Sequence, residues 1–135
     1  MTIARGEIGQ KEVIGKMANP RILEYFTKTS YQSKSDETSW CSAAMCWVME
    51  KAGIKSTRRA NARSWMKWGV GLEKFRVGCI VVFWRGSKDS WMGHVGLGVA
   101  EDEKYIWVLG GNQGNAFNIK KYPKAQLLGM RWPSK

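Results

Sequence analysis

Hydrophobic positions follow two different patterns along the chain, one in each half. In the first half, apolar side chains recur every three or four residues, which is the spacing of one helix face. This spacing predicts a central helix over 40–52, with Ser39 or Thr38 as its N-cap and Gly53 as its stop. The apolar face of this helix is expected to carry Ala43, Ala44, Trp47 and Val48.

Two further helices are expected, one before and one after the central helix. An Asn-Pro pair, which is typical of a helix start, precedes a predicted helix over 21–28. A third helix is predicted over 58–68, with Thr57 as its cap and Gly69 as its stop. The polar residues 29–39 are expected to form a surface loop.

The second half of the chain consists of short apolar runs separated by polar or glycine-rich turns, which is typical of strands. These runs predict strands over 79–84, 94–100, 105–109, 116–119 and 127–132. Helices followed by a meandering antiparallel sheet make an α+β domain. The length of 135 residues fits one domain, so 1–135 is expected to be a single domain.

Composition and charge narrow the class of protein. The hydrophobic share of 44% fits a globular chain and argues against disorder. No apolar stretch is long enough for a transmembrane helix, and the first residues lack the apolar core of a signal peptide, so synthesis in the cytoplasm is expected. The net charge of +11 favours an anionic partner: nucleic acid, an anionic membrane surface or the bacterial envelope. Because the basic residues are spread along the chain, no specific nucleic acid is expected as a partner, and nothing indicates more than a monomer.

The three cysteines have different expected surroundings. Cys41 lies in the first turn of the central helix, where free backbone N–H groups and the macrodipole lower a thiol pKa from about 8.5 toward roughly 3.5–7.5. Cys46 lies deeper in that helix, and Cys79 lies in a buried strand where desolvation favours the neutral thiol. Cys41 is therefore the candidate nucleophile, although its position alone fits a small buried side chain equally well. With no CxxC pair and one histidine, neither a metal site nor a cofactor is expected.

His94 and the glycine-rich loop that follows the next strand supply candidate partners for this thiol. His94, the only histidine, opens a predicted strand and is a candidate general base, with a purely structural histidine as the alternative. Asn112 lies on the loop at the same end of the expected sheet and is the candidate to orient the imidazole, with Gln113 as second choice. Taken alone, an asparagine beside glycine is more typical of a turn.

These features stand in an order that resembles the CHAP and NlpC-type superfamily of papain-like cysteine peptidases and amidases. The resemblance is strongest to single-domain cell-wall hydrolases of phages and prophages of Gram-negative bacteria. It covers nearly the whole chain, through residues 19–25, 36–43, 62–65, 81–86, 93–96, 109–113 and 131–133. The sequence departs from the family pattern at Cys79, where aspartate usually follows glycine, and at Ser39, where proline often precedes Trp-Cys.

The resemblance implies a papain-like fold in which Cys41 is the nucleophile, His94 the general base and Asn112 the orienting residue. It implies a peptidoglycan hydrolase of the phage endolysin kind. Such an enzyme cleaves an amide bond of the stem peptide or of its junction with muramic acid, after holin-type release to the periplasm and cell wall. Candidate substrate contacts are Trp40, Trp91, Gln113 and Glu37.

Two alternatives remain open at the level of sequence. A basic, non-catalytic module that binds nucleic acid or an anionic membrane would account for the charge and the eight tryptophans. It would not account for the positions of Cys41 and the single His94. The same chemistry would also serve an interbacterial toxin or a virion-associated lysin.

Overall fold

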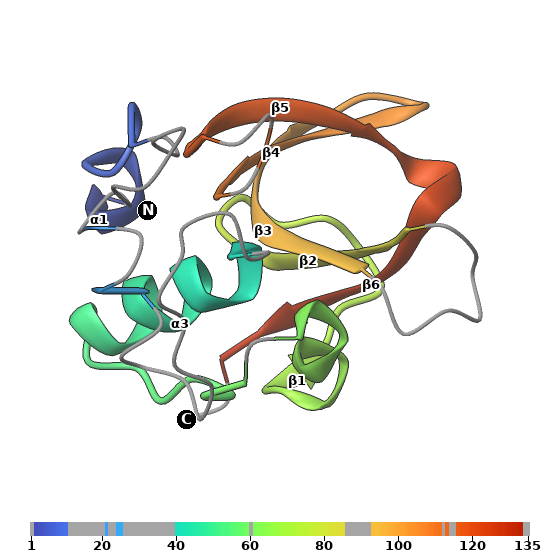
Figure 1. The fold of residues 1–135 in the computed structure, drawn as a ribbon. Coiled ribbons are helices and arrows are strands. Elements are labelled where there is room, and N and C mark those ends of the chain that lie inside the picture. The colour runs from blue at the N-terminus through green and yellow to red at the C-terminus, as the bar shows by residue number, and fades with distance from the viewer. Residues whose placement is uncertain are drawn as a thin grey trace.

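An antiparallel sheet with the order β1-β6-β2-β3-β4-β5 forms the larger part of this computed structural model, and helices pack on one of its faces (Figure 1). The structure describes residues 2–10, 21, 24–25, 40–59, 61–85, 93–111, 113 and 116–133. The strands are β1 (Val70–Gly71), β2 (Ile80–Trp84), β3 (Gly93–Glu101), β4 (Tyr105–Gly110), β5 (Asn118–Pro123) and β6 (Leu127–Trp132). The helices are α1 (Thr2–Arg5), α3 (Cys41–Lys51) and the 3₁₀ helices η1 (Ala62–Lys67) and η2 (Lys124–Gln126). The predicted α+β class is confirmed.

The sheet is a meander only in part. Strands β2 to β5 follow one another in sequence and in space, whereas β6 returns to pair with β2 on its other side. Figure 1 shows β5 arching over the sheet and η2 turning the chain back into β6. The sheet therefore curls, and each of its faces packs against a separate core.

The alternation of side chains along β2 explains the two cores. Ile80 and Val82 join α3 in the helix-side core, whereas Val81 and Phe83 join the second core inside the curl. Because successive side chains of a strand point to opposite faces, a continuous apolar run is buried on both sides. His94 is the direct cross-strand partner of Phe83, so it belongs to the face of the second core.

Helix α3 confirms the predicted central helix with a shift of one residue at its start. It begins at Cys41, and Trp40 takes the N-cap position without a side-chain capping bond, in place of Ser39 or Thr38. The Trp40 ring is completely buried and stacks on Tyr25 at 5.8 Å between ring centroids. Burial of this ring therefore accompanies the start of the helix, and no capping side chain is involved.

The predicted third helix is wrong over its first half. Arg58 has φ 55°, a left-handed conformation that does not continue an α-helix. The Thr57 hydroxyl accepts a bond from the backbone N–H of Arg59 and closes a local turn, so it caps no helix. Only the 3₁₀ helix η1 forms, and Gly69 ends it at φ 59°, where a Cβ would collide with the Trp132 carbonyl.

The remaining elements differ from the predictions mainly at their ends. The strand predicted over 116–119 lies further along as β5, because Phe117 is buried in the helix-side core and exchanges backbone bonds with residues 9–10. The short elements α1 and β1 were not predicted. Arg21, Glu24 and Tyr25 are helical, as expected, while the rest of 21–28 and the loop 29–39 lie outside the described residues. No helix in the described part of the chain is long and apolar enough to cross a membrane.

Candidate active site

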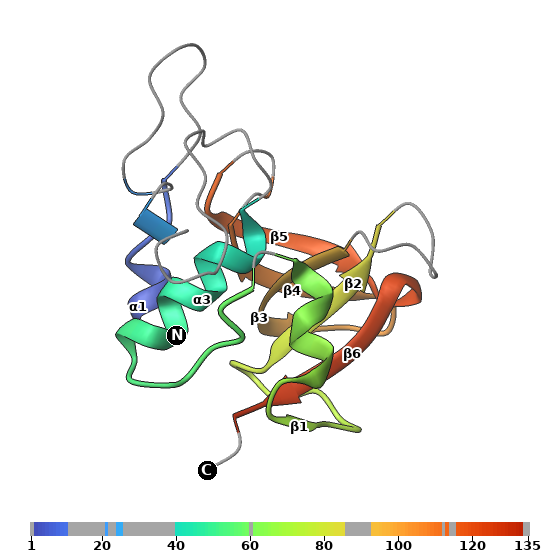
Figure 2. The ribbon, with the colours of Figure 1, turned by 60° about the horizontal axis from the view of Figure 1, so that its bottom comes forward.

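Cys41 is the first residue of α3, and its side chain is buried. Figures 1 and 2 both show the N-terminal end of this helix against the sheet. The first backbone N–H groups of a helix have no partner within it, and they favour a negative charge at this position. Cys46 lies further along the helix, with Sγ 3.7 Å from the Arg59 carbonyl oxygen. Burial raises the pKa of the Cys79 thiol, so that cysteine is neutral, as predicted.

His94 forms a buried hydrogen bond with Gln113. The imidazole Nε2 lies 2.9 Å from Gln113 Oε1, and both side chains are almost fully buried. The Gln113 amide nitrogen lies 3.1 Å from the Val108 carbonyl oxygen, and 2.9 and 3.0 Å from the carbonyl oxygen and Oδ1 of Asn118. Since acceptors surround this nitrogen, the amide oxygen must face the imidazole.

This arrangement selects one tautomer of the neutral imidazole. The Gln113 oxygen accepts a hydrogen bond, so His94 Nε2 carries the proton and donates it. Nδ1 is then the ring nitrogen with the free electron pair. Nδ1 is therefore the atom of His94 that can accept a proton.

Burial keeps this imidazole neutral. The pKa of His94 is lowered to about 4, mainly by desolvation; the bond to Gln113 opposes this shift, and the positive charges of Arg85 and Lys120 add to it. At neutral pH the ring is thus unprotonated and able to act as a base. The Gln113 oxygen stabilises the imidazolium that forms when it does.

Tyr122 lies against the imidazole of His94. Its ring stacks on His94 at 4.7 Å between centroids and on Phe83 at 5.1 Å. Burial raises the pKa of the Tyr122 phenol, and the charge of Cys41 raises it further. Tyr122 therefore covers the imidazole, and a thiolate at Cys41 would be within electrostatic range of its phenol.

Of the predicted substrate contacts and the predicted orienting residue, the structure describes Trp40 and Gln113. Trp40 is completely buried and lies against Gly111, where a Cβ would meet its ring, so it packs in the core and presents no surface to a substrate. Gln113, predicted as a substrate contact, uses its polar atoms within the protein and holds His94. Asn112, Trp91 and Glu37 lie outside the described residues.

Tyr122 was not among the predicted site residues. The sequence signal that could have found Tyr122 is the alternation of Asn118, Lys120 and Tyr122. In a strand, this spacing directs all three side chains to one face. The prediction missed it because the expected strand ended at residue 119. Within the described ranges, no group of three or more His, Cys, Asp or Glu side chains is arranged to hold a metal ion.

A thiol at the start of a helix that packs on an antiparallel sheet, together with a buried, oriented histidine on that sheet, is typical of a papain-like domain. Residues 33–112 match the family model of the CHAP domain, which is more than half of the chain. The chain therefore belongs to the CHAP domain family. This family consists generally of cysteine peptidases and amidases.

The fold is also similar to that of a larger solved protein. A crystal structure from Staphylococcus aureus subsp. aureus Mu50, described as similar to a lipoprotein of the NLP/P60 family, matches with a TM-score of 0.53 and 16% sequence identity. The match covers 92% of this chain and 45% of that chain, so this chain spans less than half of that protein's length. At this identity the likeness shows the shared fold. No curated protein sequence matches the chain.

Proposed function

We propose that the protein cleaves an amide bond of peptidoglycan, in the stem peptide or at its junction with muramic acid, with Cys41 as nucleophile and His94 as general base. The observation that carries this proposal is the bond between His94 Nε2 and Gln113 Oε1, which leaves Nδ1 as the basic atom of the ring, in a domain whose helix α3 begins with a cysteine. A base held through one ring nitrogen, with an electron pair on the other, is the form of histidine that activates a cysteine nucleophile.

The reaction follows from the roles of these groups. His94 Nδ1 takes the proton of the Cys41 thiol, and the thiolate attacks the amide carbonyl carbon. The backbone N–H of Cys41, at the helix start, donates to the oxyanion of the tetrahedral intermediate. The imidazolium returns its proton to the leaving amine, and water then hydrolyses the thioester to release the carboxylic acid.

Two residues position the base in this mechanism. Gln113 holds the imidazole through Nε2 and stabilises its charged form, and Tyr122 fixes the plane of the ring by stacking. The resemblance seen in the sequence implied Asn112 in the orienting role, with Gln113 as second choice. In the proposed mechanism Gln113 performs this role, because its amide oxygen accepts a hydrogen bond from the His94 ring.

The setting we propose is that of a phage endolysin. The protein would be made in the host cytoplasm, reach the cell wall after holin-type release and act there as a monomer without a metal. Its net charge of +11 supports attraction to the anionic envelope. The same charge favours the alternative of a non-catalytic binding module.

The test is digestion of purified Gram-negative peptidoglycan, with the released fragments identified by mass spectrometry. We expect Cys41→Ala to lower the rate at least about a thousandfold, since it removes the nucleophile. Cys46→Ala is the matched control, because it changes a second buried cysteine of the same helix and should retain activity. Equal release by Cys41→Ala and the wild type would overturn the mechanism, and no release by either would favour the binding module.

A further inference from the structure

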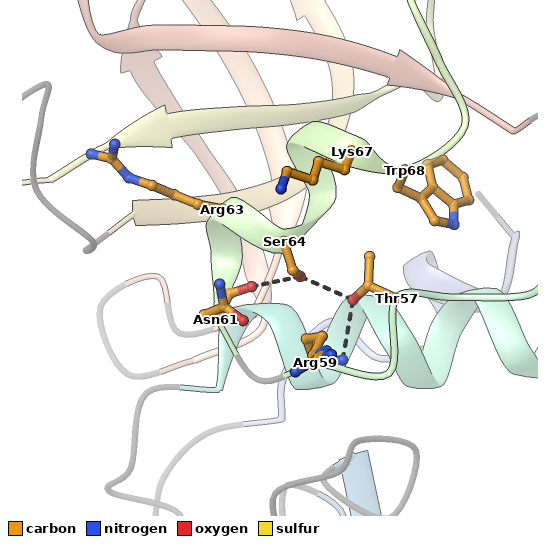
Figure 3. Close-up of a pocket in the computed structure, with 7 residues that line it drawn as sticks. All are labelled: Thr57, Arg59, Asn61, Arg63, Ser64, Lys67 and Trp68. Carbon is orange, nitrogen blue, oxygen red and sulfur yellow. Dashed lines mark hydrogen bonds between the residues drawn. The ribbon is translucent and has the colours of Figure 1, made fainter.

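A pocket of about 480 Å³ lies between η1 and the segment that precedes it (Figure 3). We propose that this pocket binds a free carboxylate of the peptidoglycan stem peptide whose amide bond is cleaved at Cys41. The inference rests on the proposed function and specifies how the substrate is recognised. The residues that line the pocket are Thr57, Arg59, Asn61, Arg63, Ser64, Lys67 and Trp68.

The charge of the pocket indicates an anionic ligand. Arg59, Arg63 and Lys67 line it, four residues apart in sequence, and none of the described lining residues is acidic. The neighbouring Arg58 pairs at 2.9 Å with Glu50, which does not line the pocket. The described lining residues therefore give the pocket a local positive potential.

The polar floor of the pocket is held in place by its own hydrogen bonds. Ser64 Oγ lies 3.0 Å from Thr57 Oγ1 and 2.8 Å from the Asn61 carbonyl oxygen, as the dashed lines in Figure 3 show. On one side, Trp68 Nε1 donates to the Lys55 carbonyl at 2.8 Å. A ligand therefore meets preformed walls, which lowers the entropy cost of binding.

Residues that line the pocket lie close to the direct chain neighbours of Cys41 and His94. The Arg59 carbonyl accepts a 2.6 Å bond from the hydroxyl of Ser42, the residue after Cys41. On the other side, a Cβ added to Gly93, the residue before His94, would lie 3.2 Å from Arg63 Cγ. Figure 3 shows the Arg63 side chain extending from η1 over the neighbouring strands. The chain segments that carry Cys41 and His94 therefore contact residues that line the pocket.

The mixture of groups favours a peptide carboxylate over a nucleic acid backbone. Guanidinium groups bind carboxylates through paired, charge-assisted hydrogen bonds, and the hydroxyl and amide groups between them suit peptide N–H and C=O groups. A nucleic acid backbone requires cations spread along a groove. Here they gather in one pocket whose volume is in the range for small ligands.

The experiment measures binding without requiring cleavage. It uses the full-length Cys41→Ala protein and two forms of one soluble stem tetrapeptide, with free carboxylates or with the same carboxylates amidated. We expect the acid form to bind about tenfold more tightly, since each exposed charge-assisted contact contributes modestly. Adding Arg59→Gln and Lys67→Gln should remove this preference.

The matched control removes two positive charges elsewhere. Both are exposed: Lys104 lies in the turn from β3 into β4, and Lys74, in the segment before β2, lines a pocket with Glu101 at the same end of β3. Lys74→Gln with Lys104→Gln, also in the Cys41→Ala protein, should keep the preference for the acid form. If both double variants lost the preference for the acid form equally, net charge and not the pocket would select the substrate. That result would overturn the inference.

Further outcomes separate this inference from the proposed function. An acid preference that survives Arg59→Gln and Lys67→Gln, or the absence of peptide binding, overturns the carboxylate site. If the pocket variant lost salt-dependent DNA affinity while it kept the acid preference, the pocket would be a nucleic-acid contact. Failure of the proposed function appears separately, as the absence of Cys41-dependent cleavage by the protein with an intact pocket.

Discussion

The two ends of β3 are held by different kinds of contact. At its start, His94 is buried, bonds to the buried Gln113 and stacks on Tyr122. At its other end, the exposed Glu101 pairs with Lys124 at 3.0 Å. Both ends contain polar contacts of similar length, so distance alone does not distinguish them.

Burial decides what each contact contributes. A buried polar group that loses its partner bears the full cost of desolvation, whereas water replaces a lost partner at the surface. The start of β3 is therefore sensitive to single changes and able to hold a neutral, oriented base. The far end serves to connect β3 to its neighbours, and changes there should be tolerated.

The largest effect is expected for Gln113→Leu. The change removes the acceptor that holds the His94 tautomer, so we expect the cleavage rate to fall on the order of a hundredfold to a thousandfold. Rates should be compared in protein shown to be folded by circular dichroism. A folded Gln113→Leu protein with an unchanged rate would show that the start of β3 does not differ functionally from its far end.

The next effect concerns pH and His94. Its pKa falls from 6.5 in the unfolded chain to about 4 in the fold, so below pH 6.5 the unfolded chain binds more protons. The contribution of the neutral His94 to the free energy of unfolding is therefore complete above pH 6.5. It is lost as the pH falls toward 4, by up to roughly 3 kcal/mol. Urea denaturation across this range measures it.

The control for this measurement is His94→Gln, which does not titrate. Other groups, such as Glu50, whose pKa the Ser56 N–H lowers, contribute equally in both proteins. The difference between the two pH profiles therefore isolates the histidine. Parallel profiles between pH 6.5 and 4 would contradict the neutral, buried state of His94.

A smaller effect is expected for Tyr122. Tyr122→Leu removes the ring that stacks on His94 and should lower kcat about tenfold, because an aromatic pair contributes about 1 kcal/mol beyond burial. Tyr122→Phe retains the ring and should stay within about threefold of the wild type. An equal loss in both variants would show that the hydroxyl acts, and not the stacking.

The smallest effect is expected at the far end of β3. Lys124→Ala breaks an exposed ion pair with Glu101 and should lower the free energy of unfolding by no more than about 0.5 kcal/mol. Urea denaturation at neutral pH checks the value, and the cleavage rate should not change. A loss of several kcal/mol would remove the contrast between the two ends.

The strands and the central helix were predictable because their signals are local. The apolar runs predicted β2, β3, β4 and β6 to within one residue at each end. The third helix was mispredicted because Arg58 adopts a positive φ, which its residue type does not favour. The β5 boundary moved because Phe117 packs with distant residues, which no local pattern reveals.

The site was predictable only as far as local position determines chemistry. The helix boundary was enough to place Cys41 at the start of α3, and the strand boundary placed His94 near the start of β3. The choice between Asn112 and Gln113 was not determined, because neighbouring residues of a loop point in different directions. The hydrogen-bond partners of the Gln113 amide settle which of its atoms faces the ring.

The sequence by itself determined the central helix and the main strands, and which of them carry a thiol and an imidazole, because both follow from residue type and spacing over a few positions. Only the tertiary structure decided that Gln113 holds the ring, that Tyr122 covers it and that Arg59, Arg63 and Lys67 share one pocket. The curl of the sheet brings β5 over β3, and the fold of 57–68 sets the pocket beside α3. Contacts between residues far apart in the chain depend on packing, which leaves no periodic signal in the sequence.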